Sequence, residues 1–253
     1  KIVSILFLVV VLSGLASAQG LPCEKVASYK IDATLDPLQK TVAGVAVLTW
    51  KNIGTAPTSE LWFHLYLNAF KNSKSTFLTE SARHYADFLA RFADDGWGFC
   101  DVLSMSASGE SFEADLEPRY MRPDDGNADD ETVFKVDLPA AIAPGKTVTV
   151  KIDFLSRLPH RAPRSGYRGD YFFVAQWFPK IGVWTDNEWN CHQYHAHSEF
   201  FSDYGDYDVR LTVPSQFIVG ACGVMTDSTA NSDNSVTVRY QQECIHDFAW
   251  TAY

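Results

Sequence analysis

Apolar side chains recur at every second position in five separate segments of this 253-residue chain. The segments cover residues 29–35, 61–67, 134–138, 148–154 and 207–213. A period of two is the spacing of a β-strand that has one face buried and the other in water. The pattern therefore predicts an all-β chain, built as a sandwich or as an open, twisted sheet.

One segment departs from this alternation and predicts a helix. Ser75 or Thr76 can cap its start, and apolar residues then recur at helical spacing until the chain reaches Gly96. These apolar residues are Leu78, Ala82, Tyr85, Leu89 and Phe92. We expect this helix to lie on a sheet.

Two further segments carry turn signals. The Asp-rich stretch at residues 124–131 predicts a solvated loop, because its spacing does not match that of an EF-hand calcium loop. Residues 218–225 and 236–242 predict a hairpin whose turn is the polar stretch DSTANSDNS.

The first residues have the layout of a secretory signal peptide. Lys1 precedes an apolar stretch at residues 2–12, and the Ala-Ser-Ala run at residues 16–18 offers a cleavage site before Gln19. The apolar stretch is shorter than the roughly 20 residues that a membrane-spanning helix needs, so cleavage is favoured over a retained anchor. We therefore expect residues 1–18 to be a signal peptide, the protein to be secreted or periplasmic, and no stable membrane span to remain.

The charge and the ends of the chain limit its partners. Thirty-one Asp and Glu residues against 21 Lys and Arg residues give a formal net charge of −10, and no cluster of basic residues occurs. Nucleic acid is therefore not expected as a partner. The chain starts without Met and stops inside the strand-like run IHDFAWTAY, so we expect a fragment of a longer protein.

Five cysteines lie at positions 23, 100, 191, 222 and 244. Export permits disulfides, and an odd number leaves at least one thiol unpaired within the chain. No Cys-x-x-Cys spacing occurs, so neither a cysteine zinc site nor a thioredoxin-like redox pair is supported. The pairing of the cysteines stays open.

Between residues 169 and 214 the chain is dense in His, Glu and Trp. His195, His197 and Glu199 would project from one face of an extended segment, where they could bind a metal. We favour a hydrogen-bonded surface instead, because structural metal sites usually draw their ligands from at least two segments. Trp side chains in the same region either form a platform for peptide or carbohydrate or pack in the core, which is the commoner role. These are Trp177, Trp184 and Trp189.

No recognised catalytic motif occurs in the chain. The Gly-x-Ser-x-Gly nucleophile elbow, the phosphate-binding P-loop and the His-Glu-x-x-His zinc motif are all missing from the sequence. We therefore expect no catalytic residue and no bound cofactor in this chain.

Five phrases follow one another along the chain after residue 18. They are YKIDATLDPLQKTVAGVAVLTWKN (29–52), LWFHLYLNAFKNSKSTF (61–77), QWFPKIGVW (176–184), SEFFSDYGDYDVRLTVP (198–214) and HDFAW (246–250). In this order they resemble the N-terminal β domain of the aminopeptidase N family of zinc metallopeptidases, and most of all its bacterial, secreted branch.

The resemblance implies a fold, a cofactor and partners. It implies a saddle-shaped, largely antiparallel, β-sandwich-like domain over residues 19–253, with one short helix inserted. A zinc-dependent catalytic domain would follow residue 253, so the zinc of the parent enzyme would be bound outside this chain and the fragment alone would be inactive. The partners would be this catalytic domain and a peptide substrate.

In that family the β domain lends one Gln or Glu side chain to the pocket for the free amino terminus of the substrate. Spacing back from Pro179 favours Asp170 for this role, whereas side-chain type favours Gln176. Either side chain would pair with the substrate ammonium group. A purely structural role, in which Gln176 satisfies buried backbone, is the alternative. The alternative function is a stand-alone secreted β-sandwich module that binds peptide or carbohydrate through the three Trp residues.

Overall fold

A computed structural model of the chain describes residues 23–84, 96–160 and 162–253. Strands dominate, and they form one sheet of eight strands, two sheets of four and one isolated pair. The described residues contain one α-helix, α1 (Thr76–His84), which follows the 3-10 helix η1 (Tyr66–Phe70). The predicted all-β, sandwich-like class with one short helix is confirmed.

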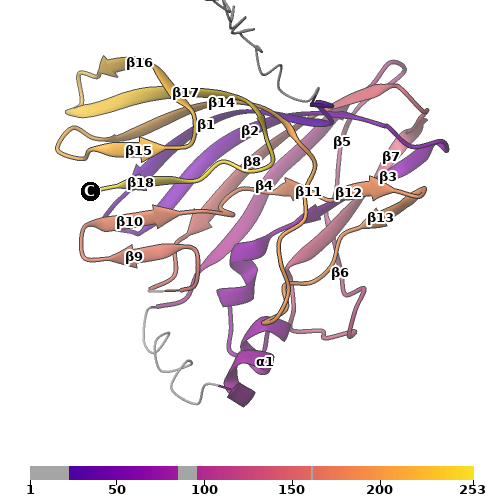
Figure 1. Cartoon of the computed structure of the whole chain (residues 1–253), viewed down its shortest axis with the longest axis horizontal. Coiled ribbons are helices and arrows are strands. Elements are labelled where there is room, and N and C mark those ends of the chain that lie inside the picture. The colour runs from indigo at the N-terminus through magenta and orange to yellow at the C-terminus, as the bar shows by residue number, and fades with distance from the viewer. Residues whose placement is uncertain (1–22, 85–95, 161) are drawn as a thin grey trace, which may run out of the picture.

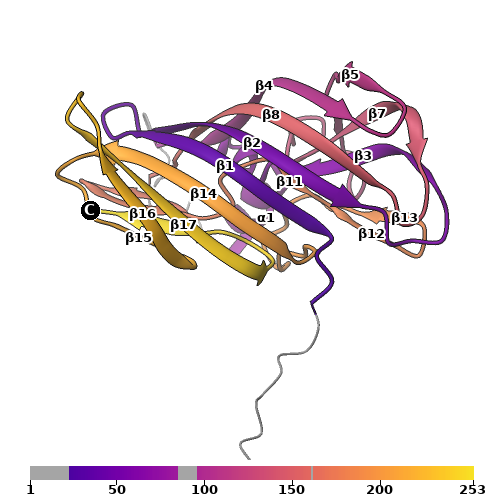
Figure 2. The same cartoon turned by 90° about the horizontal axis from the view of Figure 1, so that it is seen from above.

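The eight-stranded sheet forms one face of the molecule (Figure 2). From edge to edge its strands are β16 (Val224–Ala230), β17 (Ser235–Ile245), β14 (Gly205–Pro214), β1 (Ala27–Asp36), β2 (Thr41–Lys51), β8 (Thr147–Arg157), β4 (Phe99–Ser108) and β5 (Glu113–Asp115). β1 and β14 pair in parallel, with Tyr29 opposite Tyr207. Every other pair of named strands in the described residues is antiparallel, so the largely antiparallel arrangement is confirmed.

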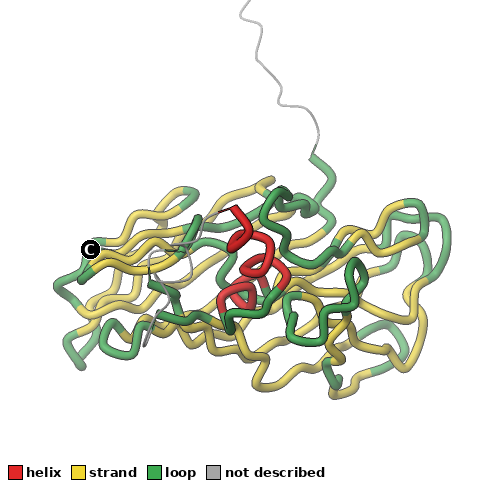
Figure 3. The backbone as a smooth tube through the Cα atoms, turned by 90° about the horizontal axis from the view of Figure 1, so that it is seen from below, coloured by secondary structure: helices red, strands yellow, loops and turns green. Residues whose placement is uncertain are grey.

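The smaller sheets and the helix lie on the other side of this sheet (Figures 1 and 3). One smaller sheet has the order β15 (Val219–Ala221), β18 (Trp250–Ala252), β10 (Tyr171–Val174) and β9 (Gly166–Arg168). The other has the order β11 (Lys180–Ile181), β3 (Thr58–His64), β7 (Val133–Ile142) and β6 (Arg119–Met121). The isolated pair is β12 (Val183–Thr185) with β13 (Glu188–Asn190).

The core lies between the eight-stranded sheet and the smaller sheets. Trp177, in the connection between β10 and β11, is fully buried, and its ring centroid lies 5.8 Å from Phe154 of β8 and 5.9 Å from Trp250 of β18. The backbone N–H of Ile181 in β11 donates a hydrogen bond of 2.9 Å to the Tyr29 hydroxyl of β1. Burying an aromatic side chain such as Trp177 contributes on the order of 3 kcal/mol, so these contacts hold the two layers together.

The alternating pattern predicts β1 correctly, but the segment that it predicts at residues 61–67 extends beyond the end of β3. In β1 the residues Ala27 to Leu35 alternate buried and outward-facing along the whole strand. The segment predicted at residues 61–67 leaves the strand after His64 and continues as η1, all of whose residues are buried. Asn68 explains this change, because its side chain donates to the Glu131 carbonyl (2.9 Å) and accepts from the Cys100 backbone N–H (2.8 Å).

The predicted hairpin is only partly correct. β16 and β17 do pair, but their turn is limited to residues 231–234, and the predicted turn residues before it belong to β16. Residues 219–221 form β15, which pairs with β18 in a different sheet. Gly223 redirects the chain between β15 and β16 with a φ of 91°, and a Cβ there would lie 2.7 Å from the Gln241 carbonyl oxygen.

The helix begins where the cap predicts. The Leu78 backbone N–H donates to the Ser75 hydroxyl at 3.3 Å, which places Ser75 in the N-cap position. The predicted continuation through Tyr85, Leu89 and Phe92 lies outside the described residues. Within the described part of the chain, no helix combines the length and the apolar character needed to cross a bilayer.

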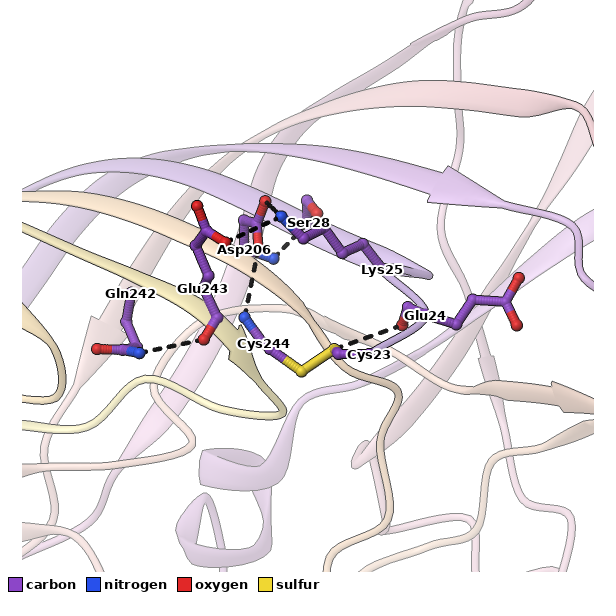
Figure 4. Close-up of a disulfide and its surroundings, with 8 residues drawn as sticks. All are labelled: Cys23, Glu24, Lys25, Ser28, Asp206, Gln242, Glu243 and Cys244. Atoms are coloured by element: carbon purple, nitrogen blue, oxygen red, sulfur yellow. Dashed lines mark hydrogen bonds and ion pairs between the residues drawn. A yellow bond between two sulfur atoms is a disulfide. The ribbon is translucent and has the colours of Figure 1, made fainter. Parts of the chain in front are cut away.

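A disulfide between Cys23 and Cys244 joins the segment before β1 to the end of β17, across 221 positions of sequence (Figure 4). Lys25 reinforces this junction, because its Nζ lies 2.8 Å from Asp206 and 3.3 Å from Glu243. The other three cysteines are free, Cys100 and Cys191 in the core and Cys222 at the surface. A cross-link that closes so long a loop restricts the unfolded chain strongly.

We predict that the double variant Cys23→Ser/Cys244→Ser lowers the free energy of unfolding by about 2–5 kcal/mol. Urea unfolding without reductant measures the change. Cys222→Ser is the matched control, because this thiol is exposed and unpaired, and its unfolding midpoint should equal that of the unmodified chain. Equal midpoints for all three proteins would contradict the prediction.

Candidate functional site

Gln176 has an unusual backbone for its residue type. It lies in the connection between β10 and β11 with a φ of 48°, in the left-handed region that side chains with a Cβ seldom adopt. Its neighbours Ala175 and Trp177 are buried, and the Trp177 Nε1 donates to the Phe248 carbonyl at 2.9 Å. The backbone of Gln176 is therefore held on both sides, while its own side chain is half-buried. Strain of this kind gathers at functional sites.

A buried ion pair lies directly beside Gln176. The Gln176 Nε2 donates to Asp247 Oδ2 at 3.5 Å, and Asp247 Oδ1 lies 3.1 Å from Lys180 Nζ. The Lys180 side chain is only 3% exposed, and it also donates to the His246 carbonyl. Burial lowers the pKa of Lys180, and the Asp247 carboxylate acts against that shift.

Asp170 lies away from this group. It is exposed in the turn between β9 and β10, beside a hollow of about 520 Å³ lined also by Leu38, Ile218 and Tyr253. β10 separates Asp170 from Gln176, and six residues of extended chain span up to roughly 20 Å. The structure therefore places the two sequence candidates at opposite ends of β10.

The segment that carries His195, His197 and Glu199 is not a strand. It turns at residues 196 and 197, so it is not the extended segment that the metal-binding alternative requires. Glu199 instead pairs with Arg164 at 2.9 Å. In the described residues, no group of three or more His, Cys, Asp and Glu side chains is placed to hold a metal.

His195 bridges two carboxylates from distant parts of the chain. Its Nδ1 lies 2.9 Å from Glu80 Oε1 of α1, and its Nε2 lies 3.1 Å from Asp124 Oδ2. Partial burial lowers the pKa of His195, but the hydrogen bonds to Glu80 and Asp124 outweigh it and the net pKa is raised. When the ring is protonated, both nitrogens donate to these carboxylates and neither has a lone pair for a metal.

The Asp-rich stretch at residues 124–131 is more than a solvated loop. Asp130 is fully buried and accepts hydrogen bonds from the backbone N–H groups of Thr76 (3.0 Å) and Thr132 (2.9 Å). Asp125 accepts from the Thr76 hydroxyl at 2.7 Å. These carboxylates lie at the start of α1, where the first N–H groups have no partner within the helix and negative charge is stabilised.

The groove beside His195 has a volume of about 500 Å³, and Asp124, His192 and several aromatic rings line it. His192 Nδ1 also contacts Asp124, at 2.6 Å. Partial burial raises the pKa of Asp124, whereas its hydrogen bonds with His192, Gln193 and His195 lower it. The hydrogen bonds have the larger effect, so the pKa is lowered overall. Sequence reasoning missed Glu80 and Asp124, because their partner lies more than 70 residues away and no local pattern marks such a contact.

The Trp residues do not form an exposed platform. Trp177 is 0% and Trp184 is 7% exposed. Trp189 is half-buried, and its ring packs against Trp50 and Trp184 at 5.2 and 5.3 Å. Core packing, which the sequence favours, therefore describes all three side chains better than a sugar- or peptide-binding surface.

We predict that His195→Gln destabilises the chain by about 1 kcal/mol near pH 6, because it removes the imidazolium between two carboxylates. The pKa of His195 is raised above its usual 6.5, so this contribution is complete below pH 6.5 and is lost as the pH rises through the raised value. At low pH it is also lost as the carboxylates become protonated.

Urea unfolding at pH 5.5, 6.5 and 8.5 checks this prediction. Glu199→Gln is the control, because the exposed pair with Arg164 contributes little to stability. A difference between the His195→Gln and unmodified chains that grows with pH would contradict the assigned charge state.

Comparison with solved structures finds this fold in zinc metallopeptidases. The M1 zinc metallopeptidase from Deinococcus radiodurans matches 90% of this chain with a TM-score of 0.53 and 15% identity, over 41% of its own length. A mutant of it bound to a Tyr-Ser-Ala substrate matches 90% of this chain with a TM-score of 0.54 and 14% identity, over 42% of its length.

No protein family and no curated protein matches the chain by sequence. At 14–15% identity the structural likeness shows the fold alone. The chain spans less than half the length of these M1 zinc metallopeptidases, and its fold is that of a β-rich part of them.

Proposed function

We propose that this chain is the N-terminal β domain of an exported, zinc-dependent aminopeptidase-like enzyme. Two independent observations support the proposal: the five ordered sequence phrases, and the fold match that covers 90% of this chain but only 42% of the matched protein. In such an enzyme the zinc and the catalytic groups would belong to a further domain. This chain would cover the active site and help to bind the amino terminus of a peptide.

Gln176 is the residue that we propose for contact with the substrate. A peptide ammonium group needs hydrogen-bond acceptors, and the amide oxygen of Gln176 is one. The observation that carries this choice is the left-handed backbone of Gln176, which is held in place by buried neighbours on both sides. Asp170 has no comparable support, because it lies exposed on a hairpin turn.

Export is supported by the disulfide. Stable disulfides form in oxidising compartments, and Cys23, in the segment before β1, is bonded to Cys244 near the end of β17. The proposed signal peptide, residues 1–18, lies outside the described residues.

Docking on a catalytic domain is supported by an exposed aromatic face formed by Tyr171 and Phe173 of β10 and by Tyr253, which follows β18. In β10, Phe172 and Val174 point into the core, so Tyr171 and Phe173 point outward, where they are 44% and 38% exposed. Tyr253 follows β18, is 73% exposed, and its ring lies 6.4 Å from that of Tyr171. Contiguous apolar surface of this kind typically marks an interface.

We predict that the full open reading frame containing this chain encodes a chelator-sensitive aminopeptidase. Gln176→Ala should raise the KM for peptides with a free amino terminus by about tenfold or more and change kcat less, because one hydrogen bond to a charged group is lost. Initial rates on Tyr-Ser-Ala and on its N-acetylated form, with and without chelator, measure this. Asp170→Asn is the matched control and should leave KM unchanged.

A reading frame without His-Glu-x-x-His after residue 253, or a protein without chelator-sensitive peptide cleavage, would remove the enzymatic proposal. If Asp170→Asn raises the KM and Gln176→Ala does not, the ammonium contact would be assigned to Asp170 in the hairpin turn.

We also predict that the chain on its own self-associates through the aromatic face. The double variant Tyr171→Ser/Phe173→Thr should shift it toward monomer in sedimentation velocity runs, because the exposed rings are removed from the face. Val224→Thr/Met225→Thr is the control, because these residues are exposed on β16 in the other sheet. Equal association by both variants would contradict a role for this face.

A further inference from the structure

The ion pair between Lys180 and Asp247 lies largely out of contact with water, where the desolvation of charged groups costs free energy. Lys180 is 3% exposed and Asp247 is 15% exposed, and rings of Phe178 and Tyr207 lie within 6 Å of the ammonium group. Desolvation of two buried charges offsets much of their attraction, so a well-packed apolar pair would stabilise a fold about as well. The stability of the fold therefore does not explain why this pair is here.

The hydrogen bonds of Asp247 are divided between its two oxygens. Oδ1 faces Lys180 and accepts from the Phe248 backbone N–H at 2.8 Å, whereas Oδ2 faces the Gln176 amide. Lys180 is held in turn by the carbonyl of His246, the residue before Asp247. Backbone and ammonium thus fix the carboxylate, and its remaining oxygen is directed at Gln176.

A carboxylate accepts hydrogen bonds and cannot donate them when ionised. The side-chain amide of Gln176 must therefore turn its nitrogen toward Asp247, which directs its carbonyl oxygen the opposite way. Without this partner the two ends of the amide would be free to exchange places. Donation from Nε2 to a carboxylate also polarises the amide and strengthens its oxygen as an acceptor.

We infer that Asp247, held by Lys180, is a positioning residue that fixes the Gln176 amide so that its oxygen is presented to the ammonium group of a peptide substrate. The inference rests on the proposed function, in which Gln176 makes that contact. Lys180 has a second effect, because it neutralises Asp247. The substrate ammonium then meets the neutral amide oxygen and is not drawn to the carboxylate behind it.

The first test uses the chain itself and reads the Gln176 amide by ¹H–¹⁵N nuclear magnetic resonance. Gln176→Glu removes the resonance pair and so assigns it. In the unmodified chain, the proton directed at Asp247 should lie downfield and exchange slowly with water. In the double variant Asp247→Leu/Lys180→Met both protons should move to the values of a free Gln side chain. The double variant removes acceptor and cation together, so that no buried charge is left unpaired.

The second test uses the full open reading frame and the KM for Tyr-Ser-Ala. Asp247→Leu/Lys180→Met should raise KM by about tenfold with little change in kcat, as expected for the loss of a bond to a charged group. Adding Gln176→Glu to this double variant should restore KM, because either oxygen of a carboxylate accepts and no orientation is needed. If the pair has only a structural role, adding Gln176→Glu would not restore the KM. Thermal unfolding of each variant verifies that it is folded.

The possible results separate the two proposals. Unchanged Gln176 amide resonances in the double variant, or a tenfold rise in KM for Gln176→Ala but none for the double variant, would overturn the positioning role and leave the proposed function standing. An active enzyme whose KM does not respond to Gln176→Ala would overturn the ammonium contact, and the positioning role with it. A protein without peptidase activity would overturn both.

Discussion

One hydrogen bond, from the indole of Trp177 to the Phe248 carbonyl, connects the parts of the chain on which the candidate site depends. It joins segments 71 residues apart, and its two ends are the immediate neighbours of Gln176 and Asp247. Because the Trp177 ring is fully buried between β8 and β18, neither segment can move without opening the core. The half-buried contact between Gln176 and Asp247 is therefore held in place by the aromatic packing around Trp177.

This arrangement explains why residues 169–214 are so rich in aromatic and titratable side chains. The aromatic residues fill the space between the layers, as Trp177 and Phe178 do, and the titratable ones occupy the borders of that space. Several titratable residues there find partners outside the segment, as Lys180 does with Asp247 and His195 with Glu80. Pairing of this kind is what makes buried or half-buried charge tolerable.

The sequence predicts the local structure better than it predicts the contacts between distant segments. Period-two patterns located β1, β7, β8 and β14, and Ser75 located the start of α1, because burial on one face and capping are local effects. The sequence does not reveal the partners of His195, because they are carboxylates on α1 and on the Asp-rich stretch. The pairing of Cys23 with Cys244 and of Asp247 with Lys180 likewise depends on the complete fold, which no spacing in the sequence reveals.

The parallel pairing of β1 with β14 has a consequence for the order in which the chain folds. β1 begins at Ala27 and pairs at once with β2, but its other neighbour begins only at Gly205. During synthesis this edge of β1 therefore has no partner strand until about 170 further residues have been added. Contacts between such distant segments also form slowly. An open strand edge is also a template for pairing with other chains. Until β14 is synthesised and pairs with it, the open edge of β1 is therefore a site at which the growing chain can pair with other chains.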